Sequence, residues 1–246
     1  MNLQNKSENY WKKTLNPVRR QISYFDEYFE SDIGKKSLEY RINILLNQKE
    51  SVESFLDIGC GYGAFSYELH NRNNNLKLAG IDISGEAIDF CKTKIENAKF
   101  VQDKFENINE HFTENSYDVV YSSGVMIHQS PDSLSSLIDN LIRIGKKYII
   151  HFEDIGGGEL LSGDKELNPK WRESDQLLWR NNLIETYHQK GCTFYFNNNI
   201  PSELHNIGFT NYMVVDLTDT NFNIQSDDDR NLILNNKEVV MERLDK

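Results

Sequence analysis

The sequence has few cysteines and prolines and no long hydrophobic run. Its 246 residues include 3 Cys and 4 Pro. The three cysteines are widely spaced, which excludes a disulfide framework or a cysteine-based zinc site and predicts a reduced, cytoplasmic protein. No apolar run approaches the roughly 20 residues of a membrane helix, and the first residues lack the apolar region of a secretory signal. We therefore expect no membrane partner and no secretion.

Basic side chains are also outnumbered. There are 27 Lys and Arg against 38 Asp and Glu, so the formal net charge is -11. Nucleic-acid binding needs a dense basic face, so this balance argues against a nucleic-acid partner. Aromatic residues make up 11% of the chain, which excludes a disordered protein. The length fits one large domain or two small ones. Because the sequence has no repeats and no linker, we predict a single domain, residues 1–246.

What is present is an alternation of short apolar segments and helical segments. Residues 1–50 have helical spacing and form a predicted N-terminal extension. Five apolar segments then have the pattern of strands, with helices between them; they lie at 54–58, 76–82, 99–102, 117–122 and 147–152. This order predicts a Rossmann-like, doubly wound α/β fold with a mostly parallel sheet, helices on both faces and a core at residues 52–153.

The alternation stops after the fifth predicted strand. Residues 154–191 contain three consecutive glycines and one helical pattern, and we interpret them as an insertion on the substrate side. Residues 192–246 return to the sheet, with a predicted short helix at 201–208 and a strand at 209–217. The pattern of residues 232–244 fits either a strand or a helix.

A glycine-rich segment follows the first predicted strand. Gly59, Gly61 and Ala64 have the G-x-G-x-x-A spacing of a dinucleotide site, and Gly63 adds a G-x-G-x-G pattern. Asp82 ends the second strand, where a carboxylate can accept hydrogen bonds from both hydroxyls of a ribose. Ligands of open parallel sheets bind at the carboxyl ends of the strands. These residues alone leave a nicotinamide-dependent oxidoreductase open.

The residues around the glycines carry a more specific resemblance. The segment Phe55–Gly63 strongly resembles motif I of the class I S-adenosylmethionine-dependent methyltransferases, including Asp57 two residues before the first glycine. Gly80–Ser84, Phe100–Asp103 and Tyr117–His128 are similar to the family's next blocks, in the same order. The resemblance covers about residues 52–153. It implies S-adenosylmethionine as cofactor and S-adenosylhomocysteine as product.

The resemblance also implies roles for individual residues. The loop at Asp57, Gly59, Cys60 and Gly61 would hold the methionine part of the cofactor. Asp82 would bind the ribose. Asp103 would accept from the amino group of the adenine, and the faces of that ring would contact Ile83, Lys104 and Phe105. The sulfonium side of the cofactor would be lined by Ser122 and Ser123. Two of these keep a structural alternative, because Asp103 can cap a strand end and Ile83 can belong to the core.

The motif after the fourth predicted strand reduces the number of possible classes of methyl acceptor. Ser122-Ser123-Gly124-Val125 stands where amino methyltransferases of nucleobases or glutamine carry Asn or Asp, two prolines and an aromatic residue. No Pro-Cys pair supplies a nucleophile for cytosine C5 chemistry. Only Glu153-Asp154 matches part of a catechol-type magnesium site, so we expect no metal. The resemblance then implies an enzyme of the broad small-molecule branch.

A few residues are candidates for chemistry or acceptor binding. His128 is the candidate general base, because an unperturbed imidazole titrates near pH 6.5; a hydrogen-bonded histidine at a helix start is the alternative. Five further residues are candidates for substrate binding. His151 and Glu153 either orient the acceptor or end the strand. Tyr10 and Trp11 either close over the cofactor or pack on the sheet, and Trp179 either lines the substrate site or belongs to the core.

We therefore predict a methyltransferase that moves a methyl group from S-adenosylmethionine to O or N of a small molecule. Two alternatives stay open at this point. The first is a nicotinamide-dependent oxidoreductase on the same glycine loop, and the second is a non-catalytic, methyltransferase-like binding subunit. The sequence does not decide between a monomer and a homodimer.

Overall fold

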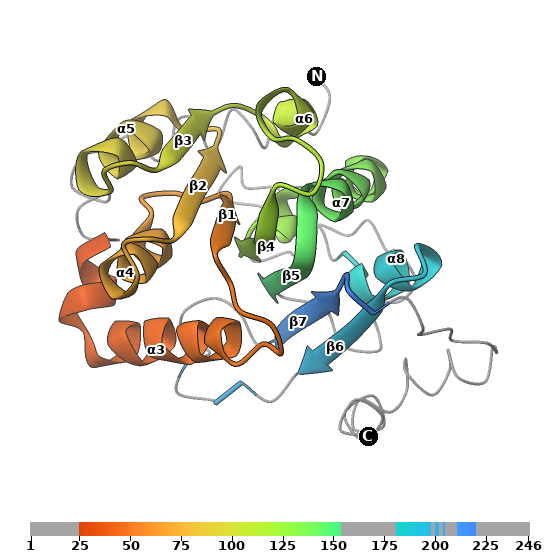
Figure 1. Ribbon diagram of the computed structural model, residues 1–246, viewed down its shortest axis with the longest axis horizontal. Helices are drawn as coiled ribbons and strands as arrows, with labels where there is room; N and C mark the ends of the chain where they lie inside the picture. Colours follow the sequence, from red (N-terminus) through yellow and green to blue (C-terminus); the bar gives the residue numbers. More distant parts are fainter. Residues whose placement is uncertain (1–24, 154–180, 198–199, 202–203, 205–210, 220–246) are drawn as a thin grey trace, which may run out of the picture.

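The computed structural model describes residues 25–153, 181–197, 200–201, 204 and 211–219 (Figure 1). These residues form one seven-stranded sheet with the order β3-β2-β1-β4-β5-β7-β6. The first five strands pair in parallel, and β7 pairs antiparallel with both β5 and β6. The strands are β1 (Ser54–Ile58), β2 (Lys77–Asp82), β3 (Lys99–Gln102), β4 (Tyr117–Ser123), β5 (Gly145–Glu153), β6 (Thr193–Asn197) and β7 (Asn211–Asp216).

Helices cover both faces of this sheet, as the alternating pattern predicts. On one face α3, α4 and α5 pack on the strands, and on the other face α6, α7 and α8 do so. Each set encloses its own apolar cluster, so the parallel strands are buried on both sides. The helices are α3 (Asp32–Leu46), α4 (Ala64–Arg72), α5 (Gly85–Lys94), α6 (Ile108–His111), α7 (Pro131–Ile144) and α8 (Leu183–Gln189), with short 3₁₀ turns η1 (Phe105–Asn107) and η2 (Met126–His128).

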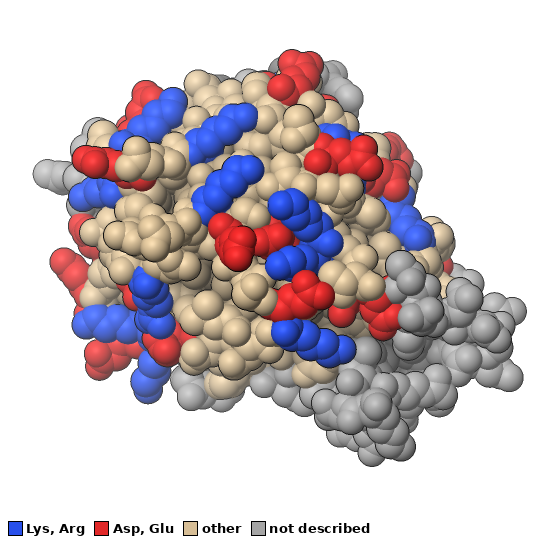
Figure 2. Space-filling view, in the orientation of Figure 1, with Lys and Arg blue, Asp and Glu red and all other residues tan. Residues whose placement is uncertain are grey.

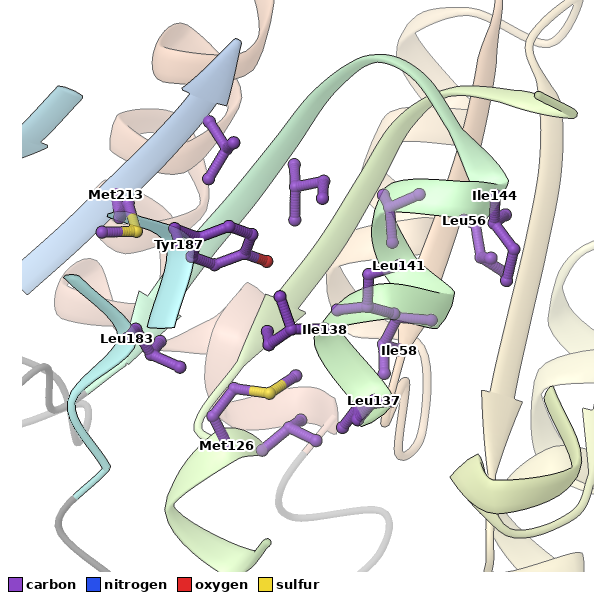
Figure 3. Close-up of a cluster of buried hydrophobic side chains, with 14 of the residues drawn as sticks. Leu56, Ile58, Met126, Leu137, Ile138, Leu141, Ile144, Leu183, Tyr187 and Met213 are labelled. Carbon is purple, nitrogen blue, oxygen red and sulfur yellow. The ribbon is translucent and has the colours of Figure 1, made fainter. Parts of the chain in front are cut away.

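The helix boundaries follow local sequence signals. Ser84 caps α5, accepting a hydrogen bond from Ala87 N at 3.3 Å, and Ser31 caps α3 in the same way through Gly34 N at 2.9 Å. Helix α7 has one strongly apolar face that is buried against the sheet (Figure 3); its buried residues are Leu134, Leu137, Ile138, Leu141 and Ile144. Burial of each such side chain contributes about 1.5–3 kcal/mol, so this face fixes the helix on the sheet.

Two parts of the fold differ from the sequence prediction. The sequence pattern does not predict strand β6, and helix α8, which falls within the predicted substrate-side insertion, packs on the core. Leu183 and Tyr187 of α8 are buried in the same cluster as α7 (Figure 3). The reason is that α8 leads directly into β6 and covers the antiparallel end of the sheet. Residues 154–180, most of 201–208 and the whole of 232–244 lie outside the described residues.

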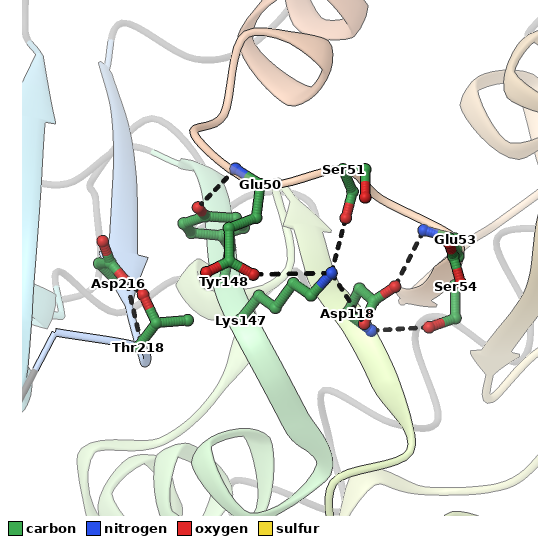
Figure 4. Close-up of polar contacts among 9 residues, drawn as sticks. All are labelled: Glu50, Ser51, Glu53, Ser54, Asp118, Lys147, Tyr148, Asp216 and Thr218. Atoms are coloured by element: carbon green, nitrogen blue, oxygen red, sulfur yellow. Dashed lines mark hydrogen bonds and ion pairs between the residues drawn. The ribbon is translucent and has the colours of Figure 1, made fainter.

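Polar contacts fasten the edge of the sheet at which the parallel strands begin (Figure 4). Asp118 accepts a hydrogen bond from Glu53 N at 2.9 Å, and its own N–H donates to Ser54 Oγ at 2.8 Å. Lys147 Nζ donates to Ser51 O at 2.7 Å and lies 3.7 Å from a carboxylate oxygen of Asp118. These contacts join β4 and β5 to the segment that leads into β1. We call them the amino-edge clamp: Ser51, Glu53, Ser54, Asp118 and Lys147.

The described part of the chain contains no helix long and apolar enough to cross a membrane.

Candidate active site

The glycine loop after β1 combines tight packing with one open position. Gly59, Gly61 and Gly63 all have positive φ, at 67°, 50° and 71°. A methyl group at Gly59 would lie 2.4 Å from Val125 Cγ2, and one at Gly63 would lie 2.8 Å from Cys91 Sγ. At Gly61 it would meet no atom of the described residues within 4 Å, its chain neighbours aside. Two glycines therefore serve packing, and Gly61 leaves its backbone open to a ligand.

A second open glycine follows β4. Gly124 has φ 65°, and a methyl group there would again meet no described atom within 4 Å beyond its chain neighbours. Strands β1 and β4 are adjacent, with Ile58 opposite Ser122, so Gly61 and Gly124 follow neighbouring strands at the same edge. This placement matches the carboxyl edge at which open parallel sheets bind their ligands.

Two buried aspartates lie at the same edge. Asp57 Oδ2 accepts a hydrogen bond from Ser66 Oγ at 2.6 Å. Burial raises the pKa of Asp57 to about 7, against the opposing effects of the Ser66 hydrogen bond and the Arg41 charge. Asp82 accepts from Gly61 N at 2.9 Å and from Ser84 N at 2.8 Å, and burial raises its pKa. Asp82 therefore also holds the glycine loop in place, a role that the sequence did not predict.

Arg41 is a buried cation that sequence reasoning missed. Helix α3 carries it on the same face as its buried leucines, so its side chain reaches the ends of β1 and β4. Its guanidinium donates to Tyr121 OH at 3.3 Å and to Ser123 Oγ at 3.5 Å, and it lies 5.4 Å from the centre of the Phe65 ring. The sequence does contain an indication of this burial, because Arg41 falls at the same helical spacing as the apolar residues Leu38, Ile42 and Leu45.

The carboxylate of Asp103 contacts neighbouring protein groups. It accepts hydrogen bonds from Lys104 N at 2.8 Å and Asn107 Nδ2 at 2.9 Å, and it lies 2.6 Å from His111 Nε2. The His111 contact holds the pKa of Asp103 below its usual range. These contacts fit the strand-end cap that the sequence left open, and an adenine contact stays a prediction. Among the other expected adenine neighbours, Ile83 is half-buried, Lys104 precedes η1, and Phe105 packs partly against the core.

His151 and Glu153 are buried at the end of β5, which fits the strand-end alternative, and a contact with the acceptor stays a prediction. His151 is fully buried, and Glu153 is 1% exposed. His151 Nδ1 lies 2.7 Å from Ser122 Oγ, and its Nε2 lies 2.7 Å from Tyr187 OH. Burial lowers the pKa of His151 to about 3 and raises that of Glu153 to about 7. Their contacts are with protein groups, because both side chains leave a central strand into the packed face under the loop after β4.

His128 ends η2, four residues after Gly124. Its backbone N–H donates to Val125 O at 3.0 Å, and its side chain is half-buried. Ser122 is buried and Ser123 half-buried at the end of β4, while Cys60 is half-buried within the glycine loop. The described residues hold no group of three His, Cys, Asp or Glu side chains that could bind a metal. Three further candidates lie outside the described residues: Tyr10, Trp11 and Trp179.

The sequence of the chain matches the model of a known protein family, and this match identifies the family. Residues 49–191, which include β1 to β5 and α8, match the model described as "Methyltransferase domain". The chain belongs to this methyltransferase family. The expected class I S-adenosylmethionine-dependent family and its α/β fold are thereby confirmed.

Relatives and solved structures agree with this family. The chain is 26% identical over 174 residues to a malonyl-[acyl-carrier protein] O-methyltransferase of Ilyobacter polytropus, covering 68% of this chain and 64% of the relative. It is 28% identical over 235 residues to a tRNA N(3)-methylcytidine methyltransferase of Schizosaccharomyces pombe, covering 88% of this chain and 69% of the relative. The plantazolicin methyltransferase BpumL, solved in complex with SAH, has the same fold, with a TM-score of 0.56 at 18% identity over 87% of this chain and 96% of that one.

The residues of this methyltransferase fit the expected cofactor. The open backbone at Gly61 and Gly124 leaves room for a ligand, and Asp57 and Asp82 place two carboxylates beside it. A carboxylate can accept from the amino group of a methionine moiety, and another from ribose hydroxyls. Each oxygen of Asp82 that accepts a backbone N–H retains a second lone pair for such a contact. The assignment of individual cofactor contacts stays a prediction.

Proposed function

We propose that this methyltransferase transfers a methyl group from S-adenosylmethionine to an oxygen or nitrogen atom of a small molecule. The observation that carries the proposal is the pair of open glycines, Gly61 and Gly124, beside buried Asp57 and Asp82. The bound cofactor supplies a methyl group already activated by a sulfonium. The protein therefore needs only to align the acceptor in line with that methyl and to accept its proton.

His128 is the proposed general base. It lies in the loop that begins at Gly124, so its ring is carried on the segment that flanks the open backbone. A neutral imidazole can take a proton from a phenol, alcohol or ammonium group near physiological pH. His151 is less suited to this step, because it is fully buried and already bonded at both ring nitrogens.

Charge supports a small acceptor over a nucleic acid. Lys104 is the only Lys or Arg in the described loops that follow β1 to β4, at residues 59–63, 83–84, 103–104 and 124–130. On the face shown in Figure 2, Lys and Arg side chains lie among Asp and Glu side chains. A polyanion needs a dense basic track, and it binds with strong salt dependence. The relative from Schizosaccharomyces pombe makes tRNA the alternative that the experiment must test.

Calorimetry and labelling together test the proposal. Calorimetry should show binding of S-adenosylhomocysteine and no comparable binding of NAD, which separates a methyltransferase from a nicotinamide enzyme. Labelled methyl groups from S-adenosylmethionine should then enter the low-molecular-weight fraction of a cell extract. Transfer to a purified tRNA fraction instead would contradict the small-molecule acceptor. Cofactor binding without transfer to either fraction would favour the non-catalytic subunit.

A further inference from the structure

A single carboxylate holds the loop that follows β4. Glu153 lies at the end of β5 and is almost fully buried. Its Oε1 accepts from Val125 N at 3.0 Å, and its Oε2 accepts from Met126 N at 3.1 Å. Backbone N–H groups of a short loop that are buried without a partner cost free energy, so this carboxylate determines where the loop can lie. The loop carries Gly124 and His128 on either side of those two residues.

An amide holds the same loop through its carbonyl groups. Asn181 Nδ2 donates to Met126 O at 2.6 Å and to Gln129 O at 2.9 Å. Asn181 is buried and lies just before α8. Glu153 therefore binds the N–H groups of the loop and Asn181 binds its C=O groups. Two side chains from different parts of the chain together fix both kinds of backbone group.

The hydrogen bonds beneath the loop have only one consistent direction when Glu153 is ionised. A carboxylate only accepts, so the Ser122 hydroxyl must donate to Glu153 Oε1, at 2.8 Å. Ser122 Oγ can then only accept from His151, which requires the hydrogen of the imidazole to be on Nδ1. His151 is neutral, so its Nε2 accepts from the Tyr187 hydroxyl. The charge of Glu153 thereby selects the tautomer of a histidine that it does not touch.

We propose that Glu153 is a positioning residue: with Asn181 it fixes the loop that carries Gly124 and His128, and through Ser122 it fixes His151 as the Nδ1–H tautomer. The meaning of this for catalysis rests on the proposed function, since His128 is the residue that the loop presents. The geometric part does not depend on turnover. It can therefore be tested even before an acceptor is known.

The first test is Glu153→Gln, read by amide hydrogen exchange and by NMR of ¹⁵N-labelled histidine. The amide side chain keeps the size of the carboxylate but turns one acceptor into a donor, which must oppose a loop N–H or the Ser122 hydroxyl. We expect exchange at Val125 and Met126 to accelerate at least about tenfold relative to amides of β1 and β4. We also expect His151 to lose its single Nδ1–H tautomer, measured above pH 7, where Glu153 is ionised in the wild-type protein.

Asp118→Asn is the matched control. Asp118 is also a buried carboxylate that accepts a backbone N–H, from Glu53, but it lies at the opposite edge of the sheet. It should leave loop exchange, the His151 tautomer and methyl transfer unchanged. If Glu153→Gln leaves Val125 and Met126 protected, the positioning role of Glu153 is overturned.

Two further variants separate the two parts of the proposal and remain useful if Glu153→Gln does not fold. Ser122→Ala should release the tautomer of His151 while the amides of Val125 and Met126 stay protected. Asn181→Ala should loosen residues 126–129 and leave the tautomer unchanged. If Ser122→Ala does not alter the His151 spectrum, or Asn181→Ala does not accelerate exchange in the loop, the corresponding part is wrong.

The link to catalysis is read from methyl transfer into the low-molecular-weight extract. For Glu153→Gln we expect the initial rate at saturating S-adenosylmethionine to fall at least about tenfold, with half-saturation by S-adenosylmethionine changed less than about threefold. A merely structural loss would lower the folded fraction instead and would affect Asp118→Asn alike. An unchanged rate would overturn the catalytic part. If the wild-type protein methylates nothing, the proposed function fails while the exchange and NMR results still decide the positioning role.

Discussion

The two edges of the parallel sheet use buried carboxylates in different ways. At the amino edge, Asp118 accepts a backbone N–H and lies near Lys147, which is itself bonded to a backbone carbonyl (Figure 4). At the carboxyl edge, Asp57 and Glu153 are held by hydroxyl and backbone donors, and burial raises the pKa of each to about 7. The first arrangement stabilises the fold. The second keeps titratable groups at displaced pKa values beside open backbone.

One fold thus separates the residues that stabilise it from those that form its candidate site. At the amino edge, a carboxylate near a cation fastens strands through contacts with other protein groups. The carboxyl edge combines displaced pKa values, which are typical of functional sites, with four glycines in the left-handed region, of which Gly61 and Gly124 are open. Substitutions at the two edges should therefore separate cleanly, with those at the carboxyl edge changing binding or turnover and those at the amino edge changing the free energy of unfolding.

The largest expected effect is at His128. General-base assistance typically contributes about 10²–10⁴-fold, so His128→Ala should lower turnover by that order while calorimetric affinity for S-adenosylhomocysteine stays nearly constant. The pH–rate profile should also lose the limb near the imidazole pKa. Full turnover with the same limb in the variant would reassign His128 to packing at the helix start.

Gly61→Val should weaken binding of S-adenosylhomocysteine by at least about 100-fold, equivalent to about 2.8 kcal/mol. The added side chain would fill the open space at the loop backbone. Gly191→Val is the matched control, because Gly191 also has positive φ, at 71°, and equally open surroundings among the described residues, but lies between α8 and β6. Both variants carry similar backbone strain. If the Gly61→Val and Gly191→Val variants bound S-adenosylhomocysteine with equal affinity in calorimetry, the glycine loop would be only a turn.

Asp82→Asn should weaken the same affinity by about tenfold or more, because hydrogen bonds to charged groups contribute about 1.5–3 kcal/mol. The variant loses charge toward a ribose and also weakens the hold on Gly61 N. Asp118→Asn serves again as the control, and its affinity should equal that of the wild-type protein. Equal affinity in Asp82→Asn would remove this carboxylate from the cofactor site.

Asp57→Asn should change how stability depends on pH. The pKa of Asp57 is raised from 3.8 to about 7 in the folded state. Its stabilising contribution is complete below about pH 4 and is lost as the pH rises through 7, because the unfolded state releases the proton first. The wild-type protein should therefore lose free energy of unfolding relative to the variant between pH 4 and 7, measured by urea unfolding. A constant difference over that range would contradict the raised pKa.

The smallest effect is expected at the amino edge. Lys147→Met removes the hydrogen bond to Ser51 O and the 3.7 Å ion pair with Asp118. It should lower the free energy of unfolding by about 1 kcal/mol and leave the affinity for S-adenosylhomocysteine unchanged. A large change in affinity would show that the two edges are coupled.

The sequence predicted the features that local patterns specify. The strand before the glycines and the positions of Asp57 and Asp82 all depend on residues close in the chain. Strand β6 was missed because it is a short edge strand, although its Thr-Phe-Tyr-Phe run has high β-propensity. The role of Glu153 could not be predicted, because its partners are backbone N–H groups 27 and 28 residues away. A sequence pattern does not show which backbone groups of a distant turn need a side-chain partner.

The position of β7 between β5 and β6 also has a consequence for synthesis. The ribosome completes β5 at Glu153 but does not reach the start of β7 until Asn211. At about 5–20 residues per second, this interval lasts roughly 3–12 s. During it, the outer side of β5 is an unpaired strand edge beside a nearly complete parallel sheet, and such edges pair readily with other chains. We therefore expect the edge of β5, which β7 covers in the finished sheet, to be prone to pairing with other chains while the chain is being made.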